Sequence, residues 1–133
     1  NMNVNFTVFI DKILSGEKRQ TIRRASQKWA NVRAGSKLTL YTGLRTKECR
    51  KLGEAFVSEV IFIEIDSRLE RVAVESPLGK AYLDEPFLRD LIERDGFDNK
   101  SAFFNFFAKT YKTCTNTMFV IRWHCFMEAK NEQ

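Results

Sequence analysis

The sequence predicts an α+β protein in which a small mixed β-barrel is flanked by helices. Three observations lead to this class: helical and strand-like periodicities succeed one another without regular βαβ alternation, one β-prone run is apolar on both faces, and two aromatic-rich segments come late. A doubly wound parallel sheet needs strands that alternate with helices, so the order argues against it. The chain of 133 residues contains no linker-like stretch, and we expect one domain over residues 2–130.

The first predicted element is an amphipathic helix. Apolar residues recur at spacings of three and four between Phe6 and Leu14, which is the periodicity of one helical face. Gly16 follows directly and is a favourable left-handed C-terminal cap. The helix is therefore expected to end at Gly16.

Two strands are predicted next. The alternation from Lys37 to Thr42 indicates a half-buried strand that ends at Gly43. The run from Glu54 to Ile65 is longer and carries apolar residues on both faces: Ala55, Val57, Ile61, Ile63 and Ile65 on one, and Phe56, Val60 and Phe62 on the other. A strand that is apolar on both faces favours a closed or covered sheet.

Two helices and a closing strand are predicted in the second half. Asp84 precedes Glu85 and Pro86, which is a helix-start signal, and Asp98-Asn99 begins a second helix. The second helix carries a stripe of Phe103, Phe104, Phe106 and Phe107. Phe has no polar group and is usually buried, so this stripe is expected to be core. The aromatic-rich residues 117–126 are expected to form a central strand.

Positive charge is concentrated in one segment. Residues 11–51 contain twelve Lys or Arg and three acids, a local net charge of +9, although the whole chain carries only +5. Such segregation creates a positive surface that attracts phosphates and polyanions. A solvated basic surface without a partner is the alternative interpretation of a charge run.

Composition also bears on compartment and cofactors. No apolar run approaches the roughly 18 residues of a membrane span, and the first residues lack a secretory-signal pattern, so we expect a cytoplasmic protein without membrane contact. Cys49, Cys114 and Cys125 are widely spaced, and we expect them to be reduced packing residues. His124 is the single histidine, and we predict neither a metal site nor a cofactor.

The stretch from Ile13 to Arg23, ILSGEKRQTIR, resembles the signature of ASCH domains, in which a helix ending in Gly is followed by Lys and then Thr-Ile-Arg. The resemblance extends to VRAGSKLTLYTG at residues 32–43, to Asp95-Gly96-Phe97 as the opening of a late helix, and to residues 119–123 as the closing strand. It covers nearly the whole chain, and the motifs are fairly specific in their order and spacing. ASCH domains are PUA-like (pseudouridine-synthase-and-archaeosine-transglycosylase-like) β-barrels, so the resemblance implies that fold.

The same resemblance implies function. ASCH domains are linked to RNA binding, and we expect RNA or a modified nucleoside as partner. One branch is similar to small amidohydrolases that remove the acyl group from N4-acetylcytidine, and its catalytic group maps onto Lys18, Thr21 and Asp95. The bacterial pattern has Glu at the acid position, so Asp95 is one methylene shorter. Some relatives resemble ribonucleases, but a sole histidine offers no two-histidine acid–base pair, and this alternative ranks last.

Lys18, Thr21 and Asp95 can act together only if the chain geometry and the pKa of Lys18 meet certain conditions. Lys18 and Thr21 are three residues apart, so in a regular strand they would face opposite sides, and they converge only if the chain turns after Gly16. Lysine is a base near neutral pH only when burial or nearby cations lower its pKa. Lys18 as a solvated loop residue and Thr21 as an ordinary strand residue remain the alternatives.

The remaining candidates are ligand contacts. Arg23 is suited to a phosphate or base edge because its guanidinium binds planar acceptors bidentately, although an ion pair with Asp95 or Glu93 competes. Three further arginines are expected to contact an RNA backbone, and aromatic residues to stack on a base, with core burial as the alternative for the aromatics. These residues are Arg19, Arg24, Arg45, Trp29, Tyr41 and Tyr82. A protein-interaction adaptor that uses the Phe-rich helices is a further alternative, and the oligomeric state is left open between monomer and weak homodimer.

Overall fold

A computed structural model describes residues 1–130 and shows a mixed α+β architecture, as predicted. The elements in order are β1 (Met2–Phe6), α1 (Ile10–Leu14), β2 (Gln20–Arg24), the 3-10 turn η1 (Gln27–Trp29), β3 (Lys37–Thr42), β4 (Arg50–Asp66), β5 (Arg71–Ser76), β6 (Gly79–Tyr82), α2 (Glu85–Asp95), α3 (Lys100–Tyr111) and β7 (Thr115–Glu128). Among the helices of residues 1–130, none is long and apolar enough to cross a membrane.

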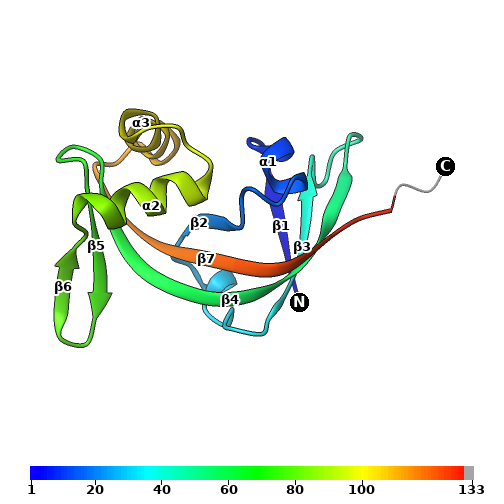
Figure 1. Cartoon of the computed structure of the whole chain (residues 1–133), viewed down its shortest axis with the longest axis horizontal. Helices are drawn as coiled ribbons and strands as arrows, with labels where there is room; N and C mark the ends of the chain where they lie inside the picture. Colours follow the sequence, from blue (N-terminus) through cyan, green and yellow to red (C-terminus); the bar gives the residue numbers. More distant parts are fainter. Residues whose placement is uncertain (131–133) are drawn as a thin grey trace.

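The seven strands form one curled sheet, a half-barrel with the three helices on its concave side (Figure 1). The order β1-β3-β4-β5-β6 is extended by β7, which pairs with both β4 and β2. β1 is parallel to β3, and every other pair is antiparallel. The long strands β4 and β7 pair over most of their length, with register shifts between Glu54 and Phe56 and between Val57 and Glu59. Such bulges bend a strand, which allows the sheet to curl.

The curled sheet holds two apolar clusters. At one end, α2 and α3 pack on β2, β5 and the adjoining parts of β4 and β7, with Phe103, Phe104 and Phe107 each at most 1% exposed. At the other end, α1 packs with β1, β3 and the opposite parts of β4 and β7. The predicted burial of the Phe stripe is confirmed for Phe103, Phe104 and Phe107, whereas Phe106 is half-buried, and β7 is central, as predicted.

The first helix is shorter than its sequence pattern predicted. Phe6 ends strand β1, and Phe9 adopts a left-handed conformation (φ 61°) immediately before α1. The parallel pairing of β1 with β3 fixes residues 2–6 as a strand, and a long-range pairing of this kind overrides a local helical periodicity. The helix ends before Gly16, as expected, and Gly16 has φ 83°.

Two further expectations need correction. Phe56 and Phe62 are 42% and 37% exposed, so the outer face of β4 is not covered, and the sheet is a half-barrel rather than a fully closed one. Cys49, Cys114 and Cys125 are free but exposed, not packed in the core. Strand β1 and the β5–β6 hairpin were not predicted, and β2 entered only as the alternative in which Thr21 is an ordinary strand residue. These strands are short, and polar residues interrupt their pattern.

The start of α3 gives a first testable result. The Asn99 side chain accepts a hydrogen bond from the backbone N–H of Ala102 at 2.9 Å and caps the helix. Replacing Asn99 by alanine leaves that donor unpaired, and we expect the free energy of unfolding to fall by about 1 kcal/mol. Urea denaturation measures it, and Asn99→Asp, which keeps the accepting oxygen, is expected to retain most of the stability.

Candidate functional site

A cavity of about 250 Å³ opens on the concave side of the sheet, between the α1–β1 side and the α2–α3 side. It is called the Lys18 cavity below. Its wall is aromatic, with the rings of Phe6, Phe9, Phe97, Phe106, Phe107 and Tyr111. Its polar lining includes Lys18, Thr21, Arg23 and Asp95. Pockets for drug-sized ligands usually measure about 300–1,000 Å³, so this one suits a smaller group.

Lys18 and Asp95 form a buried pair in this cavity. Lys18 lies just before β2, Asp95 is the last residue of α2, and their side chains are 4% and 7% exposed. The Lys18 Nζ donates a hydrogen bond to the backbone carbonyl of Asp95 and lies 3.5 Å from its Oδ1. Asp95 therefore holds the ammonium through both its backbone and its carboxylate.

Burial moves both groups of this pair toward their neutral forms. It lowers the pKa of Lys18, Arg23 and Lys12 lower it further, and Asp95 opposes the change. Burial also raises the pKa of Asp95, against the effects of Lys18 and Gln20. Desolvation penalises a charge more strongly than one nearby partner compensates. A lowered pKa increases the fraction of lysine in the neutral amine form, which is the form that can accept a proton as a base.

Arg23 joins Thr21 to the opposite edge of the sheet. Its Nε donates to Thr21 Oγ1 at 3.0 Å, and its Nη2 donates to the Asn5 backbone carbonyl at 2.7 Å. Asn5 is on β1 and Arg23 on β2, which are edge strands of the curled sheet, so this side chain bridges them. The expected alternative, an ion pair with Asp95 or Glu93, is not the contact that is formed. The Thr21 hydroxyl accepts from Arg23 and keeps its own proton for donation to a ligand.

The chain turns after Gly16, as the convergence of Lys18 and Thr21 on one site requires. Gly16 has φ 83°, and the Lys18 N–H donates to the Lys12 carbonyl at 2.9 Å, which folds the chain back before β2 begins. Lys18 and Thr21 consequently line the same cavity. Glycine adopts a left-handed φ without the steric cost that a Cβ brings, which is the physical reason for Gly16 at this place.

Asp95 reaches the cavity from the end of a helix, not from the start of one as expected. The Asp95-Gly96-Phe97 motif ends α2 and does not open a helix. Gly96 has φ 107°, and a Cβ there would lie 2.9 Å from the ring of Phe9. Phe9 in turn packs edge-to-face on Phe97 at 4.9 Å. A glycine is thus needed where α2 ends against the α1 side of the cavity.

The predicted arginines outside this group lie in three different places. Arg24 is exposed, and its guanidinium stacks at 4.7 Å on Tyr111, which belongs to the cavity wall. Arg45 is exposed in the β3–β4 loop, whose Leu44 N–H donates to Asn5 Oδ1 at 2.8 Å, so the loop is anchored beside the cavity. Arg19 is exposed near Cys125 and Phe126 and does not line the cavity.

The predicted stacking aromatics are not in the cavity wall. Trp29 is 5% exposed and belongs to the apolar cluster of β3 and β4, so its expected role as a stacking platform is corrected to a core role. Tyr41 is half-buried on β3 opposite Lys51, and Tyr82 on β6 lies under Arg71 at 4.2 Å. The aromatic rings that do line the cavity come from β1, from the Phe9 turn, from Phe97 in the α2–α3 connection and from α3.

Gln20 is a neighbour of the site that sequence reasoning missed. It is 0% exposed, and its Nε2 donates to Asp95 Oδ1 at 3.1 Å. No local signal distinguishes Gln20, because its neighbour Arg19 is also polar, lies in the same stretch and is exposed. Nothing local shows that its partner lies 75 residues along the chain.

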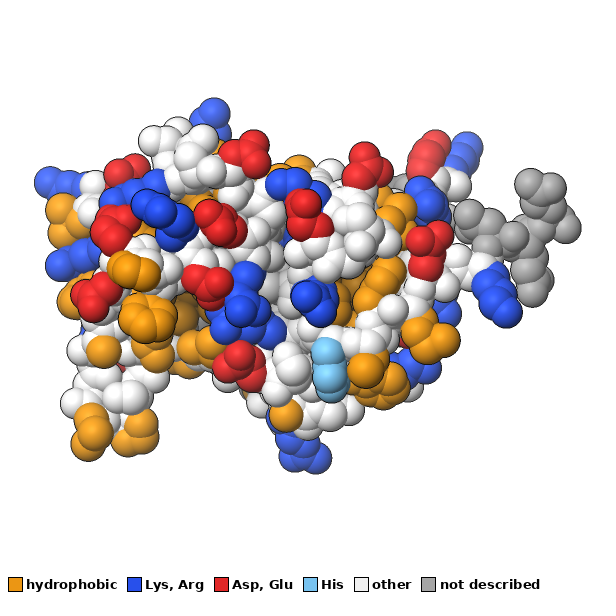
Figure 2. Space-filling model, in the orientation of Figure 1, with side chains coloured by type: hydrophobic (Ala, Val, Ile, Leu, Met, Phe, Trp, Pro, Cys, Tyr) orange, Lys and Arg blue, Asp and Glu red, His pale blue; other side chains and the backbone are white. Residues whose placement is uncertain are grey.

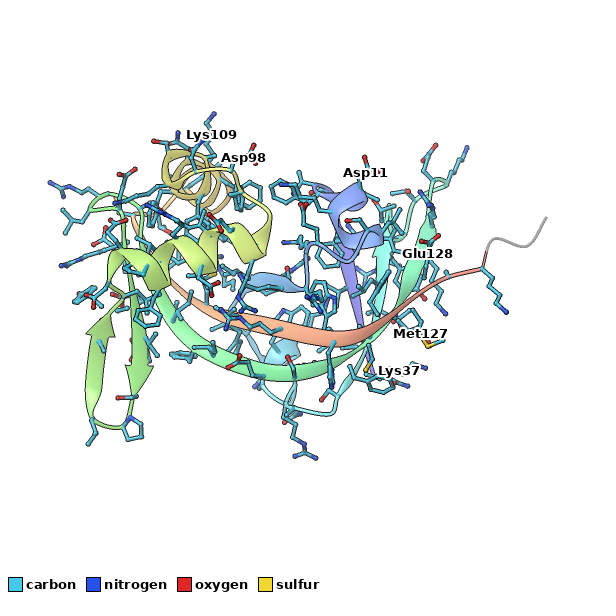
Figure 3. The ribbon with its side chains drawn as sticks, viewed as in Figure 1. Asp11, Lys37, Asp98, Lys109, Met127 and Glu128 are labelled. Carbon is cyan, nitrogen blue, oxygen red and sulfur yellow. The ribbon has the colours of Figure 1, made fainter. Side chains whose placement is uncertain are left out.

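The positive charges of residues 11–51 are partly neutralised by ion pairs. Figure 2 shows basic and acidic side chains interspersed over the viewed face rather than one continuous basic surface. Lys37 and Lys51 both pair with Glu54, and Lys12 lies 3.7 Å from both Glu17 and Asp98. Figure 3 places Asp11 on α1 and Asp98 beside α3, both on the helical side of the sheet. The +9 segment is therefore a weaker attractor of phosphate than its charge count indicates.

Comparison of the chain with models of protein families, with curated protein sequences and with solved structures gives no match.

The buried pair predicts an unusual pH dependence of stability. Asp95 has a raised pKa in the folded state, so the native protein binds more protons than the unfolded chain, and the free energy of unfolding falls as pH rises through this window. Lys18 has a lowered pKa, so the free energy of unfolding rises with pH in the alkaline window below the pKa of an unfolded lysine. Each slope is at most about 1.4 kcal/mol per pH unit. Urea denaturation across pH, with Lys18→Met/Asp95→Asn as reference, measures both slopes, and parallel curves for the two proteins would contradict the prediction.

Proposed function

We propose that this protein is a nucleotide-binding domain of ASCH type, with a PUA-like barrel, that holds one unstacked RNA base in the Lys18 cavity. The observation that carries the proposal is the convergence of Lys18, Thr21, Arg23 and Asp95 on one aromatic-walled cavity. A nucleobase is flat, stacks on aromatic rings and presents donors and acceptors at its edge. An ammonium, a hydroxyl, a guanidinium and a carboxylate together match such an edge.

The surroundings of the cavity support a polynucleotide as the source of the base. On one side Arg24 stacks on Tyr111, a ring of the cavity wall, and the β3–β4 loop is anchored beside the cavity through Asn5. That loop carries Arg45 and Lys47, which are exposed and suited to phosphate contacts. A base entering the cavity would thus have cations near both neighbouring phosphates.

Titration of a single-stranded RNA at about 50 mM and about 200 mM salt tests this proposal. Three phosphate contacts predict affinity about 20-fold weaker at the higher salt, because bound counterions are released. Arg45→Gln is expected to weaken binding and reduce the salt slope, whereas Arg68→Gln, in the exposed β4–β5 turn, is the matched control. Absence of measurable binding at the lower salt would reject the proposal.

An amidohydrolase acting on N4-acetylcytidine or a related amide is a second candidate, and the lowered pKa of buried Lys18 beside Thr21 favours it. Neutral Lys18 would take a proton from a water or from the Thr21 hydroxyl. The activated oxygen bonds to the acyl carbon, the C–N bond breaks, and the proton passes to the leaving amine. If Thr21 carries the acyl group, water then releases it, so each turnover yields the free amine and a carboxylate.

Incubation with N4-acetylcytidine and chromatographic detection of cytidine tests this second candidate. We expect turnover that Lys18→Met abolishes and that rises with pH as Lys18 loses its proton. Turnover that persists unchanged in Lys18→Met would reject the mechanism, and no cytidine from the intact protein would reject the activity.

A further inference from the structure

Gln20 lies behind the Lys18 cavity and uses its whole amide in hydrogen bonds. Its Nε2 donates to Asp95 Oδ1 and to the Leu91 backbone carbonyl, each at 3.1 Å. Its Oε1 accepts from Arg122 Nε at 3.0 Å. The residue is 0% exposed, so water does not compete for these bonds. A buried amide with two donations and one acceptance has a fixed position.

Arg122 determines which way this amide faces. A guanidinium only donates, so the atom of Gln20 opposite Arg122 must be the oxygen, and the nitrogen then faces Asp95. The reversed amide would place its oxygen against two acceptors and its NH₂ group against a cation. Arg122 on β7 is itself held by Glu59 on β4, with Nη1 to Oε2 at 3.2 Å. A network of Glu59, Arg122, Gln20 and Asp95 thus connects β4, β7 and β2 to the end of α2.

We propose that Gln20 is a positioning residue for Asp95, with its amide orientation set by Arg122. Gln20 occupies Oδ1, and no hydrogen bond to Oδ2 is formed by the residues that the structure describes. Asp95 lines the cavity, so Oδ2 is the oxygen left for a ligand. That this ligand is a nucleotide rests on the proposed function. The hydrogen-bond network itself rests only on the distances between Gln20, Asp95, Arg122 and Glu59.

A purely structural role is the competing explanation, because the bond to the Leu91 carbonyl also ties β2 to α2. Such a tie would change stability without changing the titration of Asp95. The charged groups that face Asp95 are Lys18 before β2, Arg23 on β2, and Lys12 on α1, which donates to the adjoining Gly96 carbonyl at 2.6 Å. Tyr111 of α3 lines the same cavity. These groups are unaltered in the variants below.

Carbon-13 NMR of the Asp95 carboxyl group, followed across pH without any ligand, separates the two explanations. Donation by Gln20 favours the ionised carboxylate, so Gln20→Met is expected to move the titration midpoint of Asp95 upward. Arg122→Met is expected to move it the same way, and Arg122→Lys, which keeps a donor and the charge, to move it less. In the Gln20→Met background, Arg122→Met is expected to add almost nothing, because its effect passes through the amide.

Two results would overturn the inference. An unchanged Asp95 titration in Gln20→Met removes Gln20 as the positioning residue. Equal effects of Arg122→Met with and without Gln20 show that Arg122 acts through its charge and does not orient the amide.

Ligand binding provides a separate readout. Removing a charge-assisted hydrogen bond at the carboxylate is expected to weaken nucleotide binding about tenfold in Gln20→Met near neutral pH. If the unaltered protein binds no nucleotide, the proposed function fails while the NMR titration still tests the network. If Gln20→Met binds as well as the unaltered protein although its Asp95 titration has moved, Oδ2 is not the ligand contact and that part of the inference is overturned.

Discussion

Replacement of Lys18 by methionine is expected to weaken nucleotide binding at least about 100-fold and to destabilise the fold by about 3–5 kcal/mol. Methionine keeps much of the volume of lysine but removes the ammonium, which is 4% exposed and lies 3.5 Å from Asp95 Oδ1. An uncompensated buried carboxylate then remains, and breaking a buried pair in this way typically costs that amount. Calorimetric titration measures the affinity, and urea denaturation measures the stability.

The double variant Lys18→Met/Asp95→Asn separates the two effects. It removes both charges, and replacing both members of a buried pair is often neutral or stabilising. We expect stability close to that of the unaltered protein together with the full loss of binding. A double variant that recovers both stability and affinity would show that the pair serves only the fold.

Replacement of Phe107 by alanine is expected to lower the free energy of unfolding by about 3–5 kcal/mol and to open the cavity wall. Phe107 is 1% exposed, stacks on Tyr111 with centroids 6.0 Å apart, and contacts the rings of Phe97 and Phe103. Deleting the ring removes a surface against which a base would pack, so binding is expected to weaken in addition to the loss of stability. Thermal unfolding and RNA titration measure the two effects.

Phe103 provides the matched control for this variant. It lies on the same helix and in the same apolar cluster and is 0% exposed, but it does not line the cavity. Phe103→Ala is expected to cost similar stability and, at a temperature where both variants are folded, to bind RNA more tightly than Phe107→Ala. Equal affinities would indicate that the aromatic wall does not contact the ligand.

Sequence reasoning succeeded where the signal was local. The helix start at Asp84, the Asn99 cap, the Phe stripe of α3 and the alternation of β3 each depend on residues within one or two turns, and all are present in the structure, although the Asp84 side chain forms no capping hydrogen bond. The class of fold followed from the order of these elements. Short strands with polar residues, such as β2, owe their structure to pairing with β7 far along the chain, and their pattern did not reveal it.

In the candidate site too, the residues that belong to local motifs were predicted, and those that depend on distant packing were not. Lys18, Thr21 and Asp95 were singled out from motifs, and the structure brings them to one cavity. Trp29 and Tyr41 were expected in the site because aromatic residues stack on bases, but residue type does not tell which face of a strand or turn a ring occupies. The six rings of the cavity wall and the contacts of Gln20 arise from the packing of distant segments, which no local pattern encodes.

Two-dimensional ¹H–¹⁵N NMR of the unaltered protein during titration with a short single-stranded RNA tests the central claim most directly. If one base enters the Lys18 cavity, the largest amide shifts are expected at Thr21, Arg23, Gly96 and Thr110, which line or adjoin it. Smaller shifts are expected in the β3–β4 loop. Saturating RNA that shifts the loop amides and leaves those four unchanged would contradict a base-binding role of the cavity.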